Sequence, residues 1–281
     1  MCFVFESLAA EPTLVVKAMP EARYAGRLRH ETEIVESIRR RLGPSSPAAA
    51  ALPLAALFAG TAADDYVVVQ PVDPLAGNTG RIDDRAAALA WLRSFQEGTA
   101  ITTRAWEDAD TAAALDSVRY AWRRERSVSA EAIIAQVDGL LQALEGQLVR
   151  RCAVHGDFWR GNIARGDGEL RVYDWEWAEE QGTPFFDLWT FELGVLRKKA
   201  EDGECDLRQP LVEAVARVSA ELEAQGLHRG FALATLAPSL ARLVFRVRRA
   251  TGLPGGAEAE SVRLMAAVEG LLPESAGAHV S

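Results

Sequence analysis

The segment 154–189 constrains the fold of this chain more than any other, because it gathers the densest set of polar side chains in the sequence. Within it, NIARGDGELRVYDW predicts a short strand, a turn at 167–168 and a returning strand, since Asp-Gly between alternating apolar residues favours a two-residue hairpin. Such a hairpin brings Asn162 and Asp174 to the same end. The chain should therefore fold around a pair of strands that presents both polar side chains together.

A third oxygen-bearing side chain, Asp157, lies just before the first strand of this hairpin. Carboxylate and amide oxygens are the ligands that a hard cation such as Mg²⁺ prefers. An Asp, four residues, an Asn and then a strand-flanked Asp is also the order in which kinases carry their proton acceptor and metal ligands. Turn residues without a shared role are the alternative for each position alone, but the joint spacing favours phosphoryl transfer.

The first 70 residues predict a strand, a second strand, a helix and a third strand, from CFVFES, TLVVKAM, the stretch 27–42 and DYVVVQP. The helix places Glu31 on the same stripe as its apolar residues, and Lys17 sits within an otherwise apolar strand. Each buried charge needs a partner, so Lys17 and Glu31 are candidates to pair with each other. A lysine that reaches water from an edge strand and a surface glutamate are the alternative.

The segment PVDPLAGNTG is the best candidate for a hinge, because Pro, Gly, Asp and Asn favour turns over helices and strands. After it the sequence becomes mainly helical. Apolar periodicity predicts helices over 82–97, 129–149, 188–200, 208–225, 231–250 and 258–272.

Composition and charge exclude several classes of function. A net charge of −9 and a pI near 5.1 argue against a surface that binds nucleic acid or a membrane, since both need clustered Lys and Arg. The cysteines, Cys2, Cys152 and Cys205, are too scattered for a disulfide framework or a zinc site. The amino-terminal apolar stretch is broken at Glu6, and no apolar run reaches the ~18 residues of a membrane span. We therefore expect a cytoplasmic protein.

Two motifs taken together, HGDFWRGN and YDWEWAEEQGTPFFDLW, resemble the aminoglycoside phosphotransferase and choline kinase-like family. At the front of the chain, LVVKAM resembles the family's nucleotide-lysine strand, LRHETEIVESI its following helix and YVVVQPV its hinge strand. The resemblance weakens after about residue 200. It implies an α+β, two-lobed protein-kinase-like fold, with a small antiparallel-sheet nucleotide lobe over 1–75 and a larger, mainly helical catalytic and substrate lobe over 76–281.

The resemblance also implies a role for each polar residue in an ATP- and Mg²⁺-dependent kinase of small-molecule alcohols. Asp157 would be the catalytic base. Asn162 and Asp174 would bind Mg²⁺. Lys17, paired to Glu31, would contact the phosphates of ATP.

Three further residues would support this site. His155 resembles the family's histidine that steadies the catalytic loop through a fixed hydrogen bond and does not move protons. Asp187 resembles a buried carboxylate that hydrogen-bonds the same loop. Glu176 stands where protein kinases carry a small residue, so the sequence DWE points towards small-molecule kinases. The short stretch from Asp174 to GTPFFDLW leaves little room for the activation segment of a protein kinase.

One departure from the family keeps a second function open. Kinases of this type carry a glycine-containing loop over the phosphates, whereas the first glycines here, Gly26, Gly43 and Gly60, are not spaced to form one. A start later than the natural one, an open but working site, and a loss of phosphoryl transfer are the competing explanations. The last would make the chain a pseudokinase-type protein that binds a ligand or partner.

The residues around the predicted metal loop have two interpretations each. The acidic group of Glu176, Glu179 and Glu180 could attract an amine-bearing substrate, or form a solvated turn. Nearby tryptophans could form an aromatic surface for a quaternary ammonium or a sugar, or fill the core; they are Trp159, Trp175, Trp177 and Trp189. The resemblance implies an acceptor that is an amino sugar, a sugar, a choline-like molecule or another alcohol.

Overall fold

The computed structural model describes residues 2–4, 13–19, 22–62, 65–75, 85–124, 130–166, 169–203, 206–251 and 256–272. The chain divides into two compact units, each built from two segments. The first unit comprises residues 1–101 and 152–182, and the second comprises residues 102–151 and 183–281. All but one of the predicted site residues, Asp187 being the exception, belong to the first unit.

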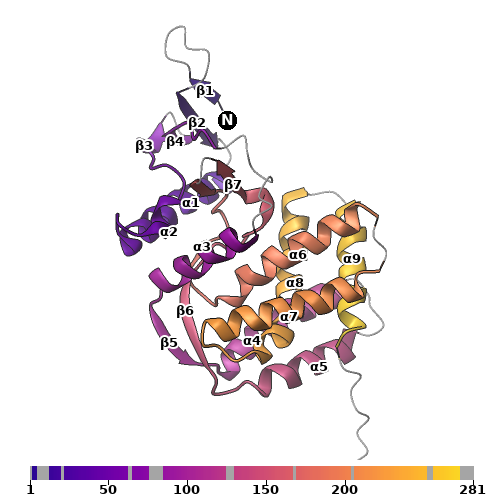
Figure 1. Ribbon diagram of the computed structural model, residues 1–281. Helices are drawn as coiled ribbons and strands as arrows, with labels where there is room; N and C mark the ends of the chain where they lie inside the picture. The colour runs from indigo at the N-terminus through magenta and orange to yellow at the C-terminus, as the bar shows by residue number, and fades with distance from the viewer. Residues whose placement is uncertain are drawn as a thin grey trace, which may run out of the picture. The chain divides into compact units, whose positions relative to one another are not determined.

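A four-stranded antiparallel sheet with the order β1-β2-β4-β3 begins the first unit (Figure 1). Its strands are β1 (Cys2–Val4), β2 (Leu14–Met19), β3 (Phe58–Ala62) and β4 (Asp65–Pro71). The helix α1 (Ala22–Leu42) packs against β2 and β4, where Leu28 joins Tyr66 and Val68 in a buried cluster. The predicted strand, strand, helix and strand are confirmed, and the structure adds the short helix α2 (Pro47–Ala50) and β3 before the last strand.

The second segment of the first unit, residues 152–182, contains the predicted hairpin. A 3-10 turn (Arg160–Asn162) leads into β7 (Ile163–Gly166), which pairs with β8 (Glu169–Val172) in antiparallel register from Ile163 opposite Val172 to Gly166 opposite Glu169. The hairpin is therefore confirmed, while its turn at 167–168 lies outside the described residues. The backbone N–H of Tyr173 donates to the carbonyl of Asn162 at 2.8 Å, which brings the two ends of the hairpin together as predicted.

An aromatic core lies beside this hairpin in the first unit. The helix α3 (Arg85–Gly98) contributes Trp91 and Phe95, whose rings stack with a centroid distance of 5.0 Å. Trp91 also stacks on Phe158 at 5.4 Å, and Trp175 meets Phe95 edge-on at 5.6 Å. Because Phe158 and Trp175 follow Asp157 and Asp174 directly in sequence, their burial holds both polar loops against one rigid base.

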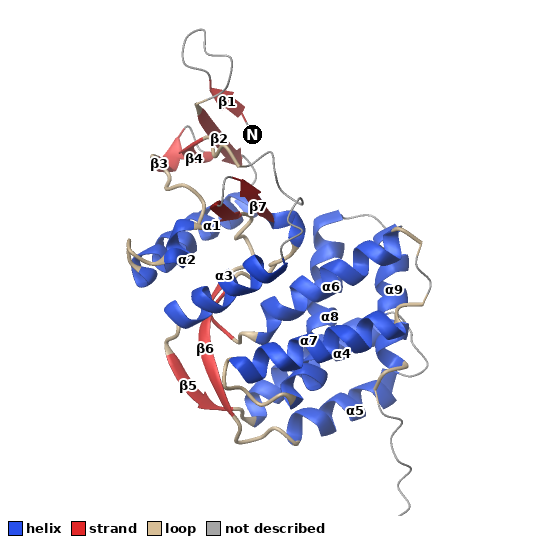
Figure 2. Ribbon diagram, in the orientation of Figure 1, coloured by secondary structure: helices blue, strands red, loops and turns tan. Residues whose placement is uncertain are grey.

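The second unit is mainly helical (Figure 2). Its helices are α4 (Asp108–Arg124), α5 (Ala130–Gln142), α6 (Phe185–Glu201), α7 (Arg208–Ala224), α8 (Gly230–Thr251) and α9 (Gly256–Glu269). The helix α8 contacts each of the other five and forms the centre of their packing. None of the helices among the described residues is both long and apolar enough to cross a membrane.

The predicted helix over 129–149 is wrong at its carboxyl end. The helix α5 stops at Gln142, and Leu148 begins a strand, β6 (Leu148–Val154), with 63% of its surface exposed. Gly146 has a backbone φ of 79°, a left-handed conformation that a helix does not continue through. The first half of β6 pairs with β5 (Thr102–Ala105), and its second half pairs with β9 (Glu179–Gly182). We did not predict β5, β6, β9 or the helix α4.

Candidate active site

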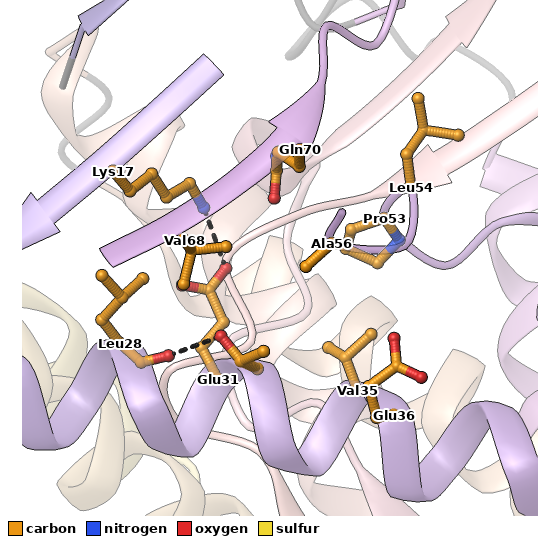
Figure 3. A pocket seen from close by; sticks show the side chains of 11 residues that line it. Lys17, Leu28, Glu31, Val35, Glu36, Pro53, Leu54, Ala56, Val68 and Gln70 are labelled. Atoms are coloured by element: carbon orange, nitrogen blue, oxygen red, sulfur yellow. Dashed lines mark hydrogen bonds and ion pairs between the residues drawn. The ribbon is translucent and has the colours of Figure 1, made fainter. Parts of the chain in front are cut away.

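An ion pair links the sheet of the first unit to α1. Lys17 Nζ lies 3.3 Å from Glu31 Oε1, and the two side chains are 22% and 18% exposed (Figure 3). Lys17 stands two residues beyond buried Val15 on β2, and therefore on the same face of the sheet. Glu31 follows Leu28 by three residues on α1, so helical periodicity turns both towards that face. The structure thus contains the expected pair, and Lys17 does not extend freely into water.

His155 connects the two polar loops. It is fully buried, and its Nδ1 accepts a hydrogen bond from the backbone N–H of Asp157 at 3.1 Å. Its Nε2 lies 2.8 Å from the carbonyl oxygen of Tyr173, so we assign the proton to Nε2 as the donor of that bond. One neutral imidazole therefore fixes the backbone at Asp157 and the backbone just before Asp174, which is a positioning arrangement.

Asn162 is held against Asp157 by its amide nitrogen. Asn162 Nδ2 donates to the Asp157 backbone carbonyl at 3.0 Å and to its carboxylate Oδ2 at 2.9 Å. These bonds orient the Asp157 carboxylate, and they use the donor end of the amide. The Oδ1 atom of Asn162 is therefore the end of this side chain that can serve a cation.

Asp174 occupies an unusual backbone conformation among crowded carboxylates. Its φ of 64° lies in the left-handed region that few non-glycine residues adopt, which marks a position held by its surroundings. Loss of solvent around its carboxyl group, followed by repulsion from Glu176, Asp157 and Glu31, raises the pKa of Asp174 to about 6, and Lys17 opposes the shift. A cation at this position would relieve the repulsion among the carboxylates.

An open pocket of about 260 Å³ brings several of these residues together. It is lined by Lys17, Ala18, Met19, Arg27, Leu28, Glu31, Asp174 and Glu176. A second, much smaller pocket of about 30 Å³ lies against the same ion pair and is drawn in Figure 3. Lys17, Leu28 and Glu31 line both pockets, so the ion pair forms part of the wall of each.

The structure also shows a site residue that sequence reasoning missed. Arg27 on α1 lines the larger pocket, and its Nη1 lies 3.4 Å from Glu176 Oε2. Its guanidinium also stands 5.4 Å from the centroid of the Trp177 ring. Arg27 precedes Glu31 by one helical turn, and this i, i+4 spacing was the available signal for it.

The acidic residues Glu176 and Glu180, near the predicted metal loop, each contact basic or polar side chains of α1. Glu176 pairs with Arg27, and exposed Glu180 accepts a hydrogen bond from Ser37 and lies 3.7 Å from Arg41. The tryptophans are likewise divided, because Trp175 and Trp189 are fully buried, one in each unit. Core filling is therefore the correct interpretation for these two rings.

Asp187 lies in the second unit, in the first turn of α6, and its side chain is fully buried. Its predicted contact with the catalytic loop stays a prediction. Cys152 is buried and takes no part in a disulfide bond.

A buried ion pair anchors the hairpin to the segment after β4. Arg171 on β8 lies 3.1 Å from Asp73, whose side chain is 5% exposed. Asp73 also accepts a hydrogen bond from the backbone N–H of Leu75 at 2.9 Å, and the backbone N–H of Val172 donates to Ala51 at 2.8 Å. These bonds connect residues 73–75, part of the predicted hinge segment, to β8 of the hairpin, while the rest of that segment, 76–80, lies outside the described residues.

Together, the fold and this arrangement of polar residues define a kinase-like phosphotransferase. The model of the phosphotransferase enzyme family matches residues 4–202, and the chain belongs to that family. It is a small-molecule kinase, an enzyme that transfers a phosphoryl group to small-molecule substrates.

Solved structures of low sequence identity share the fold. A glucosamine kinase has 17% identity and a TM-score of 0.53, with 93% of this chain and 74% of that chain covered. The aminoglycoside phosphotransferase APH(4)-Ia has 16% identity and a TM-score of 0.53, with 91% and 86% covered. A choline/ethanolamine kinase family protein from Mesorhizobium loti has 16% identity and a TM-score of 0.52, with 92% and 82% covered. A comparison with proteins of curated function gives no match.

Proposed function

We propose that this chain transfers the γ-phosphoryl group of ATP, with Mg²⁺, to a hydroxyl group of a small molecule such as an amino sugar, a sugar or a choline-like alcohol. The observation that carries the proposal is the hydrogen-bonded unit of Asp157, Asn162 and His155 beside Asp174. A solved structure of similar fold offers support. It is a thermostable mutant of APH(4)-Ia in a ternary complex with AMP-PNP and hygromycin B, and it matches this chain with 14% identity and a TM-score of 0.52.

The residues present fit a magnesium ion. The carboxylates around Asp174 repel one another, and the Oδ1 end of Asn162 provides a neutral oxygen. Within the described part of the chain, no group of three or more His, Cys, Asp or Glu side chains could enclose a metal by itself. The carboxylate of Asp174 and the amide oxygen of Asn162 suit Mg²⁺, which proteins commonly bind through one or two side chains together with substrate phosphates and water. Bound there, Mg²⁺ would neutralise phosphate charge.

Each of the proposed site residues has a defined task in the reaction. Lys17, held by Glu31, would bind a phosphate oxygen and orient the nucleotide. Asp157 would accept a hydrogen bond from the acceptor hydroxyl and align its oxygen with the γ-phosphorus. It would take up the hydroxyl proton as the new oxygen–phosphorus bond forms and the bond from the γ-phosphorus to the β–γ bridging oxygen breaks, with ADP as the leaving group. Asn162 and His155 would keep the Asp157 carboxylate and its backbone in place. Residues 1–75 would form the nucleotide lobe and residues 76–281 the catalytic and substrate lobe.

Calorimetric titration with ATP, with and without Mg²⁺, tests this function in the wild-type chain and in Asp174→Asn. We expect Mg²⁺-dependent ATP binding in the wild type and a loss of about 10-fold or more in the variant, because an amide attracts a cation less than a carboxylate does. Asparagine tolerates the left-handed backbone at this position and removes a repelling charge. The variant should therefore melt no lower than the wild type, which separates lost binding from misfolding.

The competing function, a pseudokinase-type binding protein, makes a different prediction. Mg²⁺-dependent ATP binding followed by phosphate transfer to an alcohol or amino sugar in a substrate screen would exclude it. A wild-type chain that binds no nucleotide in either condition would remove the kinase proposal. The cytoplasmic location stays a prediction.

The ion pair supports a second prediction. Glu31→Gln should lower kcat/KM by about 10- to 100-fold, because Lys17 loses the partner that fixes its ammonium group near the phosphates. The free energy of unfolding should change by less than about 1 kcal/mol, since the pair is partly exposed. Glu33→Gln, at an exposed position on the same helix, is the matched control. Equal activities of the two variants would show that the pair does not position Lys17 for catalysis.

A further inference from the structure

The larger pocket of the first unit contains a second cation whose purpose the proposed reaction does not explain. Arg27 and Lys17 both line this pocket, together with the carboxylates of Glu31, Asp174 and Glu176. Lys17 and Arg27 reach it from different elements, the strand β2 and the helix α1. The two cations therefore border the same space as the residue proposed to bind Mg²⁺.

Two of the contacts that Arg27 makes, those with Glu176 and Trp177, are long. Its distance of 3.4 Å to Glu176 is longer than the 2.7–2.9 Å that is typical of a strong charge-assisted hydrogen bond. The Trp177 ring, at 5.4 Å, lies near the outer limit for a cation–π contact. The Arg27 side chain is 26% exposed, so its guanidinium can exchange one anionic partner for another without a large desolvation cost.

The helix α1 does not depend on Arg27 for its place beside the metal loop. His30 Nε2 lies 2.9 Å from the carbonyl oxygen of Ala178, and Ser37 and Arg41 both contact Glu180. Three further residues along the same helix thus connect it to 178–180. A purely structural role for the Arg27–Glu176 pair would duplicate these contacts.

We propose that Arg27 binds the polyphosphate of the nucleotide, exchanging Glu176 for a phosphate oxygen when a nucleoside triphosphate enters the pocket. The inference rests on the proposed kinase function and adds a residue to it. A guanidinium presents paired N–H donors that match the oxygens of a phosphate. Glu176 would hold this guanidinium at the pocket wall while the nucleotide is absent.

The experiment is a calorimetric titration of the Mg²⁺-loaded chain with ATP, ADP and adenosine, in the wild type, Arg27→Ala, Arg27→Lys and Arg29→Ala. Arg29 is an exposed residue of the same helix whose guanidinium stands over the Tyr66 ring at 5.1 Å, away from the lining of the pocket. We expect Arg27→Ala to weaken ATP binding by about 10- to 100-fold, the usual effect of losing a hydrogen-bonded charge contact. ADP should lose less, and adenosine should be unaffected.

The controls separate this role from a structural one. Arg27→Lys should recover part of the ATP affinity, and Arg29→Ala should stay within about twofold of the wild type because it removes an equal charge outside the pocket. Equal losses for ATP and adenosine, together with a lower melting temperature, would identify Arg27 as a structural clamp and overturn the inference. Unchanged ATP binding by Arg27→Ala would also overturn it while leaving the kinase function intact. If the wild type binds no ATP, both proposals fail.

Discussion

Replacing Asp157 by asparagine is expected to lower the turnover number of phosphoryl transfer by about 10²- to 10⁴-fold, the usual contribution of a general base. The amide cannot take up the proton of the acceptor hydroxyl. It retains an oxygen that can accept the hydrogen bond from Asn162 Nδ2, now 2.9 Å from Asp157 Oδ2. The change therefore removes the proton acceptor and keeps the loop that carries it.

Steady-state kinetics with a substrate found in the screen, together with ATP titration, check this result. ATP affinity should stay within about threefold of the wild type, since the proposed contact of Asp157 is to the acceptor. Asp116→Asn, which removes an exposed carboxylate paired with Arg119, is the matched control and should keep full turnover. Near-normal turnover of Asp157→Asn would remove Asp157 from the chemistry and with it the proposed mechanism.

Replacing Gly156 by alanine should destabilise the protein by about 3 kcal/mol or more, from backbone strain and overlap together. Gly156 has a φ of 82°, and an added Cβ would lie 2.1 Å from the backbone oxygen of Trp177. A backbone atom cannot move aside as the end of a flexible side chain can. The loop of Asp157 and the loop of Asp174 touch here, so relief of the overlap must push the two apart.

Chemical denaturation measures the loss, and another glycine isolates its cause. Gly146 has a similar φ of 79°, but an added Cβ there would meet nothing within 4 Å. Gly146→Ala should therefore cost only the strain of the left-handed backbone, about 1 kcal/mol. Equal destabilisation by the two substitutions would mean that the close approach to Trp177 is relieved without cost. In that case the contact between the two loops would not be rigid.

Short-range patterns in the sequence were enough to predict the hairpin and, together with the family resemblance, the ion pair. Asp-Gly between alternating apolar residues predicts a hairpin from neighbouring residues alone, and the observed pairing of β7 with β8 brings Asn162 close to the residue before Asp174. Lys17 and Glu31 were predictable because a charge on an otherwise apolar face requires a partner. The hairpin follows from the alternation of apolar residues around a turn, and the ion pair follows from the cost of burying a charge.

The elements that sequence reasoning missed depend on pairing between distant segments. The predicted helix over 129–149 runs into the first two residues of β6, because Leu144 and Leu148 continue the helical period of α5. The strand form of β6 depends on β5 and β9, which begin 46 residues before it and 31 residues after it. The spacing of apolar residues alone does not tell whether Leu148 continues the helix or begins a strand. The left-handed backbone at Gly146, which ends the helical path, is visible only in the structure.

The sequence by itself determined the family and the identity of the residues proposed to carry the chemistry, because their types and spacing lie within two short motifs. Only the tertiary structure decided how those residues are held. His155 bridges Asp157 and Tyr173, Gly156 allows the close approach to Trp177, and α1 brings Arg27 to Glu176. Each contact joins residues far apart in sequence or needs a particular backbone conformation, so only the packing of the whole unit could reveal it.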